Sequence, residues 1–294
     1  MKAHRWHGAS GGRRALIAVD LDQTLIFTAR LAPVEAPGLR VVERVDGRPA
    51  AVMTDRAWEL LAALAAHHEV VPVTTRTVEQ LRRVEVPSGI RWSICANGGR
   101  LVSGGVPVGE WDRWATGLAA GAAPLVEAER VLASADDTWV RLRRTADHLF
   151  CYLVAHAADR IDATWLAQAQ AWAAGHGWTL SVQGRKVYLV PAGLSKGAAV
   201  QRLRTRLDDE EAAAPGRRLL AAGDSLLDAG MLLAADAAVR PAHGELQRHP
   251  TLVPGVEVVQ GVGPAAGEAI LVWLASAAAN LTATPPHSPA DLPA

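Results

Sequence analysis

Short apolar runs alternate along the chain with segments of helical periodicity. Residues 15–20 form an apolar run that ends in a carboxylate, the pattern of a strand buried on both faces. Residues 55–67 repeat apolar side chains at helical spacing, and Thr54 or Asp55 suits the N-cap of such a helix. Residues 69–74 have the pattern of the next strand. This order predicts a strand, a helix and a second strand packed as one unit.

The same pattern returns after Pro191. The expected elements there are helices over 195–207, 226–234 and 265–279 and strands over 218–222, 237–239 and 256–259. A short helix over 81–84 and a strand over 91–96 complete the N-terminal half. Strands and helices that alternate on both sides of a differently patterned middle predict an α/β fold, with a doubly wound, Rossmann-like core on a parallel sheet.

The middle of the chain predicts a separate α+β unit that is rich in tryptophan. Its expected elements are helices over 127–132 and 161–176 and strands over 139–144, 148–154, 179–182 and 186–190. We therefore expect a core over 15–102 and 190–280, an inserted α+β domain over 103–189, a flexible N-terminus over 1–14 and a disordered, Pro-rich tail over 281–294.

Composition excludes several classes of function. The 294 residues include 30 basic and 30 acidic side chains, and this balance argues against a dedicated nucleic-acid or anionic-membrane binder. The longest uncharged apolar run, 269–281, is shorter than the roughly 20 residues of a membrane span, and residues 15–19 are too short for the core of an export signal. Cys95 and Cys151 are too few for a disulfide scaffold, so we expect a cytoplasmic protein without membrane or nucleic-acid partners.

Four acidic residues at predicted strand ends suggest a metal site. Asp20 and Asp22 leave the first strand, and Asp224 and Asp228 follow the apolar run 218–222. An Asp-x-Asp pair alone is common in surface turns, and an aspartate at a helix start is often an N-cap. Parallel strands, however, place their C-terminal ends at one edge of the sheet, and carboxylates gathered there repel one another unless a cation lies between them.

Two further groups suggest a bound phosphate. Thr74, Thr75 and Arg76 form a polar exit from the predicted strand 69–74, with a hydroxyl and a turn suited to a phosphate oxygen. Lys196 lies in the first turn of a predicted helix, where a cation is electrostatically out of place unless an anion is its partner.

The four motifs are those around Asp20, Thr74, Lys196 and Asp224. In this order they resemble the haloacid dehalogenase superfamily of phosphatases. Within it they resemble the members with a cap inserted between the second and third motifs, such as Cof-type and sucrose-phosphate-phosphatase-like enzymes. The resemblance covers nearly all of residues 15–274. It implies that Asp20 is the nucleophile, that Asp22 is the general acid and base, and that Thr74 and Lys196 bind phosphoryl oxygens. It further implies that Mg²⁺ is the cofactor, and the implied ligands are the Asp20 carboxylate, the Asp22 backbone carbonyl and Asp224, with Asp228 in support.

The resemblance and the spacing together give a set of expected substrate-binding residues: Thr24, Thr75, Arg76, Asn97, Arg185, Lys186 and Ser225. Three positions depart from the family pattern. Gln23 stands where most members have glycine, Ala96 replaces the usual glutamate beside Asn97, and Leu227 replaces the common asparagine between Ser225 and Asp228. Because of these departures, the resemblance does not identify the substrate.

The resulting expectation is a Mg²⁺-dependent phosphatase for a small phosphomonoester, resembling a sugar or polyol phosphate, that acts as a monomer or homodimer. Phosphoryl transfer of the phosphomutase type uses the same aspartyl-phosphate and remains an alternative. A non-catalytic metabolite-binding protein of the same fold is a second alternative, against which the intact Asp20, Asp22, Lys196 and Asp224 argue.

Overall fold

The computed structural model describes residues 15–29, 37–210 and 216–283, and its centre is a parallel sheet. The strand order is β15–β14–β13–β1–β5, with every neighbouring pair parallel. The bounds of these strands are β1 Leu16–Val19, β5 Glu69–Pro72, β13 Leu219–Ala222, β14 Ala237–Pro241 and β15 Glu257–Val259. The predicted doubly wound parallel-sheet fold is confirmed.

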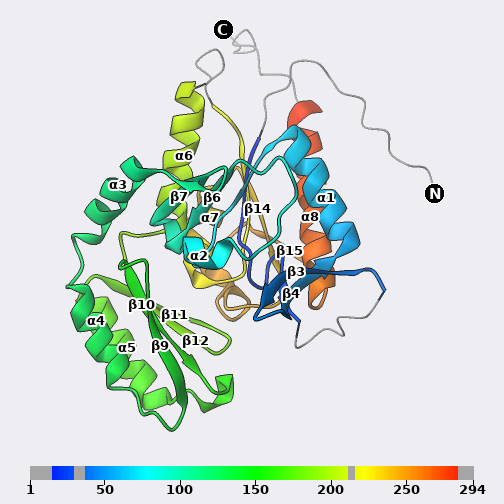
Figure 1. The fold of residues 1–294 in the computed structure, drawn as a ribbon. Coiled ribbons are helices and arrows are strands. Elements are labelled where there is room, and N and C mark those ends of the chain that lie inside the picture. The colour runs from blue at the N-terminus through cyan, green and yellow to red at the C-terminus, as the bar shows by residue number, and fades with distance from the viewer. Residues whose placement is uncertain (1–14, 30–36, 211–215, 284–294) are drawn as a thin grey trace.

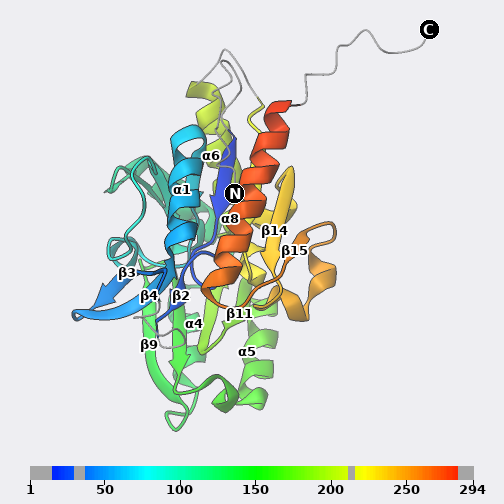
Figure 2. The ribbon, with the colours of Figure 1, turned by 90° about the vertical axis from the view of Figure 1, so that its right-hand side faces the viewer.

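Helices cover both faces of this sheet because alternate side chains of its strands are apolar on both sides. Leu16 and Ala18 of β1 pack in one cluster with residues of α6 and α7, whereas Ile17 and Val19 pack in another with residues of α1 and α8. Figure 2 shows α1 and α8 side by side over β1. The helix bounds are α1 Asp55–His67, α6 Lys196–Glu210, α7 Ala229–Leu233 and α8 Pro264–Ala283.

A meander of three antiparallel strands extends the sheet beyond β5. Val73 and Ile94 form a parallel bridge that joins β6 (Trp92–Cys95) to it, and β7 (Arg100–Ser103) and β8 (Val106–Pro107) follow. Helix α3 (Gly109–Ala119) lies against this region, where the Trp111 indole N–H donates to the Gly98 carbonyl at 2.9 Å.

The inserted domain is a four-stranded antiparallel sheet with two long helices, seen in green at the lower left of Figure 1. Its strand order is β11–β12–β10–β9. The bounds are β9 Val140–Ala146, β10 Phe150–Ala155, β11 Trp178–Gln183, β12 Lys186–Pro191, α4 Leu125–Ala133 and α5 Ala163–Gly175. Below we call this unit the cap.

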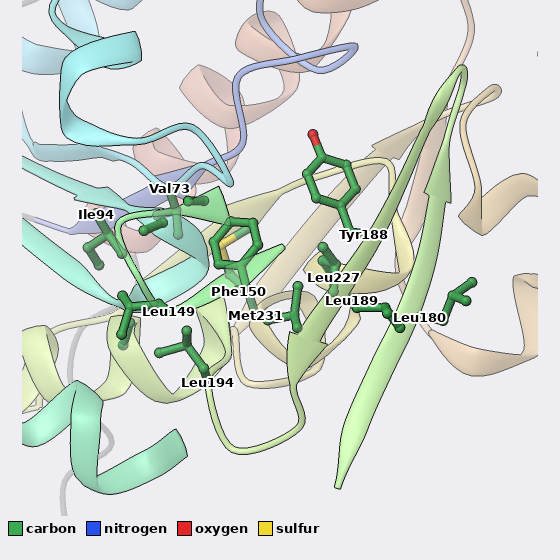
Figure 3. Packing of buried hydrophobic residues seen from close by; sticks show 14 of the residues in the cluster. Val73, Ile94, Leu149, Phe150, Leu180, Tyr188, Leu189, Leu194, Leu227 and Met231 are labelled. Carbon is green, nitrogen blue, oxygen red and sulfur yellow. The ribbon is translucent and has the colours of Figure 1, made fainter. Parts of the chain in front are cut away.

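The cap packs on the core through a shared apolar cluster. Phe150 and Leu189 of the cap belong to the same buried cluster as Val73, Leu227 and Met231 of the core. Figure 3 shows these side chains gathered around the junction, with the Tyr188 hydroxyl pointing away from them. This burial holds the cap in contact with the edge of the sheet where the strands end.

Some elements differ from the sequence prediction. The short helix expected over 81–84 is instead α2 (Val78–Leu81), because Thr77 and Gln80 form a capping box that begins the helix earlier. The sheet β2–β4–β3 was not predicted, and its bounds are β2 Phe27–Thr28, β3 Leu39–Val45 and β4 Arg48–Thr54. Short 3₁₀ turns cover 96–98, 158–160, 226–228, 246–248 and 250–252.

The two predicted terminal segments are only partly covered by the structure. The N-terminal segment 1–14 and residues 284–294 of the predicted tail lie outside the described residues. Residues 281–283 were expected in the tail but are the last turn of α8. No helix in the described ranges is long and apolar enough to cross a membrane.

Candidate active site

The C-terminal ends of three neighbouring strands bring the predicted motifs together. Asp20 follows β1, Thr74 lies just beyond β5, and Asp224 follows β13. Because β13, β1 and β5 are adjacent and parallel, the three residues leave the sheet at the same edge. The order of motifs in the sequence therefore becomes a single site in space.

Lys196 lies at the centre of this site. Its ammonium group donates to Asp20 at 2.5 Å and to Asp228 at 2.6 Å, and the residue is 1% exposed. Burial disfavours the charge, but the two carboxylates outweigh that effect and raise the pKa of Lys196 well above its usual value. A cation in the first turn of α6 is thus compensated by buried anions, as its unusual position suggested.

Asp228 fixes the loop that follows β13. Its second oxygen accepts from the backbone N–H of Asp224 at 3.0 Å and from the N–H and hydroxyl of Ser225 at 2.8 and 2.7 Å. Gly223 permits this tight turn, since a Cβ there would lie 2.5 Å from the Asp228 Cβ. Ser225, expected to bind substrate, is therefore engaged within the loop.

Three buried carboxylates form the potential metal site. Oxygens of Asp20, Asp224 and Asp228 all lie within 4.8 Å of one another. Burial raises the pKa of Asp20 to about 7, against the opposing effect of Lys196, and burial with the neighbouring Asp20 raises the pKa of Asp224 well above its usual value. Lys196 compensates only part of this negative charge, so a further cation would stabilise the cluster. Because all the donor atoms are oxygens, they fit a hard divalent cation such as Mg²⁺.

Asp22 points to a different partner from that of Asp20. Arg76 donates to both of its carboxylate oxygens at 2.8 Å, and a further Arg76 nitrogen lies 2.9 Å from Glu43. Burial alone raises the pKa of Asp22, but the guanidinium outweighs burial and holds the pKa well below its usual range. Asp22 is therefore a carboxylate in this arrangement, and Glu43 on β3 holds Arg76 in place.

The remaining predicted residues of the core lie around these groups. The Thr24 hydroxyl lies 3.5 Å from Asp224, and the buried Thr74 hydroxyl accepts from the Arg76 N–H at 3.2 Å. Thr75 is 8% exposed. The Asn97 amide donates to the Leu194 carbonyl at 2.9 Å, whereas its buried Oδ1 has no hydrogen-bond partner. Asn97 thus links the loop after β6 to the segment before α6.

A cavity of about 850 Å³ lies between core and cap above this site. The predicted residues that line it are Asp22, Arg76, Arg185, Lys186 and Asp224. Neighbouring Tyr188 and Asp22 raise the pKa of Lys186 well above its usual value despite burial, so the cap delivers a charged lysine near Asp22. A second hollow of about 540 Å³, between α3 and α6, contains none of the predicted site residues.

The cap is also tied to the active-site loops by Glu245. This buried carboxylate accepts from the Ser181 hydroxyl at 2.7 Å, from the Val182 N–H at 2.9 Å and from the Leu226 N–H at 3.0 Å. Ser181 and Val182 belong to the cap strand β11, and Leu226 belongs to the loop that carries Asp224 and Asp228. A single side chain therefore couples the cap position to the metal-site loop.

The three departures from the family pattern have structural consequences. Gln23 adopts φ 66°, a left-handed conformation that glycine adopts at lower cost, and Ala96 likewise has φ 49°. Leu227 is 8% exposed and packs in the apolar cluster at the junction with the cap (Figure 3). Apolar packing thus replaces the polar side chain that this position commonly holds.

Sequence reasoning missed four residues of this region. Glu43 lies on β3 of the unpredicted sheet, where arginines flank it in the same strand, so the sequence offered no distinct signal for it. His243 and Glu245 lie in the loop after β14, and Arg248 lies in the 3₁₀ turn over 246–248; no periodicity or motif identified them. His243 places its Nε2 2.8 Å from the Gln23 carbonyl oxygen, to which it donates.

Comparison with known proteins identifies the fold. No protein-family model matches the sequence, and no curated protein matches it significantly. Among solved structures, sucrose-phosphatase from Synechocystis in complex with sucrose and phosphate is 15% identical with a TM-score of 0.60, covering 90% of this chain and 98% of that one. A sugar phosphatase of haloacid dehalogenase subclass IIB is 12% identical with a TM-score of 0.57, covering 89% and 98%.

A third solved structure supports the same assignment. The C-terminal domain of trehalose-6-phosphate phosphatase from C. albicans is 13% identical with a TM-score of 0.54, covering 90% of this chain and 94% of that one. The likeness extends over core and cap together, since about nine-tenths of the chain is matched in each case. The protein therefore has the fold of the capped, subclass IIB haloacid dehalogenase-type phosphatases, as the order of its four motifs predicted.

Proposed function

We propose that this protein is a Mg²⁺-dependent phosphatase that hydrolyses a small phosphomonoester, of the sugar or polyol phosphate type, through an aspartyl-phosphate. The observation that carries the proposal is the buried Lys196, held between Asp20 and Asp228 at the sheet edge, beside Asp22 and Asp224, which line the capped cavity. A buried lysine with carboxylates at a strand end is suited to bind a phosphoryl group beside a nucleophile. The fold shared with sugar phosphatases supports the same proposal.

In the proposed first step, a carboxylate oxygen of Asp20 attacks phosphorus and the bond from phosphorus to the substrate oxygen breaks. Lys196 and the Thr74 hydroxyl bind the phosphoryl oxygens, and Lys196 compensates their negative charge. Mg²⁺, bound by Asp20, Asp224 and the Asp22 backbone carbonyl with Asp228 in support, would supply further electrostatic stabilisation of the phosphoryl oxygens. The products of this step are an acyl phosphate on Asp20, the aspartyl-phosphate, and the alcohol, which forms when the departing alkoxide takes a proton from Asp22.

Asp22 would transfer the protons. Its carboxylic acid form would donate a proton to the departing alkoxide, and its carboxylate would then take a proton from the water that hydrolyses the aspartyl-phosphate. In the geometry described above, Arg76 holds Asp22 as a carboxylate. The first step therefore requires substrate binding to loosen the contact with Arg76, so that Asp22 gains a proton and turns to the leaving oxygen.

The cap restricts the substrate to a small molecule. The cavity of about 850 Å³ is closed on one side by the β11–β12 hairpin, and Glu245 fastens that hairpin to the core. Such a cavity admits a phosphorylated metabolite and excludes a folded phosphoprotein. We propose that the protein meets this metabolite in the cytoplasm, as a monomer or a homodimer.

The test is release of inorganic phosphate from a panel of sugar and polyol phosphates, with Mg²⁺ and with EDTA. Asp20→Asn is expected to lower kcat by about a thousandfold or more, because the nucleophile is lost at nearly unchanged shape. Asp159→Asn, the same change at an exposed carboxylate, is the control and is expected to leave kcat unchanged.

The outcomes separate the alternatives. Mg²⁺-dependent release that Asp20→Asn abolishes supports the phosphatase. Conversion of one phosphate ester into its isomer without released phosphate would indicate a phosphomutase. Binding of substrates without either reaction would overturn the catalytic proposal in favour of a metabolite-binding protein.

A further inference from the structure

The cavity above the phosphoryl site carries basic side chains from both the cap and the core. The described residues that line it include four with a fixed positive charge and three with a carboxylate, namely Arg76, Arg185, Lys186 and Arg248, and Asp22, Asp224 and Glu245. Several of these charges already have partners in the protein.

The three carboxylates are all engaged. Asp22 accepts two hydrogen bonds from Arg76, so this pair neutralises one of the four cations as well. Asp224 belongs to the carboxylate cluster that fits a divalent cation. The oxygens of Glu245 accept from one hydroxyl and two backbone N–H groups.

The other three cations are less fully engaged, and among them Lys186 has Tyr188 and Asp22 as neighbours. The Arg185 guanidinium donates to the carbonyl of His156 at 3.3 Å, an uncharged contact. Neither Arg185, Lys186 nor Arg248 forms an ion pair with any carboxylate in the described ranges. The first two come from the β11–β12 hairpin of the cap, and Arg248 comes from the loop after β14 in the core. Contact between cap and core therefore places positive charge that the described carboxylates compensate only in part around one cavity.

We propose that Arg185, Lys186 and Arg248 form a second anion-binding subsite, so that the substrate carries a carboxylate or a second phosphate besides the phosphate that is removed. Like charges in a partly enclosed cavity repel one another, and a bound anion relieves that repulsion. Guanidinium groups match the geometry of carboxylate and phosphate, which both present paired oxygens. This inference rests on the proposed function and narrows its substrate class from sugar or polyol phosphates in general to those with two anionic groups.

The experiment compares matched substrates that differ in one anionic group. The pairs are 3-phosphoglycerate with glycerol 3-phosphate, 6-phosphogluconate with glucitol 6-phosphate, and glucose 1,6-bisphosphate with glucose 6-phosphate. The first two pairs test a carboxylate at two distances from the phosphate, and the third tests a second phosphate. For each pair, kcat/KM is measured in wild type, in Arg185→Gln/Arg248→Gln, and in Arg141→Gln, an exposed cap arginine outside the cavity.

We expect the wild type to prefer the more highly charged member of at least one pair by about tenfold or more in kcat/KM. The double variant is expected to reduce that ratio by about tenfold, mainly through KM, whereas Arg141→Gln leaves it unchanged. Equal use of both members of every pair, or a preference that survives in the double variant, would overturn the inference while leaving the phosphatase intact.

Binding provides a readout that does not depend on turnover. The same pairs are titrated into Asp20→Asn and into Asp20→Asn/Arg185→Gln/Arg248→Gln by calorimetry. Tighter binding of the more highly charged members, lost in the triple variant, supports the subsite even if no phosphate is released by the wild type. Absence of release then counts against the proposed function alone, and equal affinity within every pair counts against the subsite.

Discussion

Replacing Asp224 by asparagine is expected to stabilise the metal-free protein. Asp224 is buried with oxygens of Asp20 and Asp228 within 4.8 Å, and Lys196 is the cation that contacts this group among the described residues. The substitution removes one negative charge at nearly constant shape. A site built to bind a cation is thus expected to cost stability when that cation is missing, as active sites often do.

The size of the effect follows from the geometry. Two unit charges 4.8 Å apart at an effective dielectric constant of 20 repel by about 3.5 kcal/mol. Asp224 faces two such carboxylates, and its attraction to Lys196 offsets about one of the two repulsions. Relaxation and the loss of the long contact with Thr24 reduce the remainder, so we expect a gain of about 1–3 kcal/mol in the free energy of unfolding. For a chain of this size the gain corresponds to a rise in Tm of about 2–6 °C.

The pH dependence of stability predicts the sign of this effect independently. Burial and the neighbouring Asp20 raise the pKa of Asp224 in the folded state above its value of 3.8 in the unfolded chain. The folded protein therefore binds more protons, and its stability falls as the pH rises above 3.8 until the folded-state pKa is passed. Asp224→Asn lacks this loss, so its advantage over wild type is expected to be small near pH 4 and to grow toward pH 8.

The assay is thermal unfolding in EDTA and in Mg²⁺ at both pH values, with Asp159→Asn as the exposed control. Mg²⁺ at ten times its Kd is expected to raise the free energy of unfolding of wild type by about 1.4 kcal/mol, and with it the Tm, and to have little effect on Asp224→Asn. If Asp224→Asn is less stable than wild type in EDTA at pH 8, or if the difference in Tm between them does not change with pH, the inferred repulsion among the three carboxylates is refuted.

Three further predictions concern the cap, the strained backbone and the thiols. Glu245→Gln removes acceptor capacity from the bonds that fasten β11, so amide hydrogen exchange over 181–183 is expected to accelerate about tenfold, and unchanged exchange would count against the tie. Gln23→Gly relieves a left-handed residue, and a gain of about 0.5–1 kcal/mol is expected in urea denaturation; a loss would contradict it. Burial raises the pKa of both Cys95 and Cys151 to about 12, so a thiol reagent at pH 8 is expected to label them only after unfolding, and rapid labelling of native protein would show exposure.

The architecture was largely readable from the sequence because its signals are local. Apolar strands that end in Asp20 and in the loop of Asp224 carry their own pattern, and parallel strands place their C-terminal ends at one edge. The antiparallel cap was predicted from the changed pattern of its strands and helices. The β2–β4–β3 sheet was missed because its strands are short or mixed in polarity, and Thr77 shifted α2 through a capping interaction.

By itself the sequence determined the identity and order of the groups at the strand ends, and hence the fold and the kind of chemistry they suit. Only the tertiary structure decided which charges are neutralised. Arg76 pairs with Asp22 and Glu43, and Glu245 accepts hydrogen bonds from the cap. Arg248 and Arg185 line one cavity, and neither forms an ion pair among the described residues. The physical reason is that a strand or helix pattern depends on neighbours along the chain, whereas charge compensation depends on partners that approach through space from distant segments.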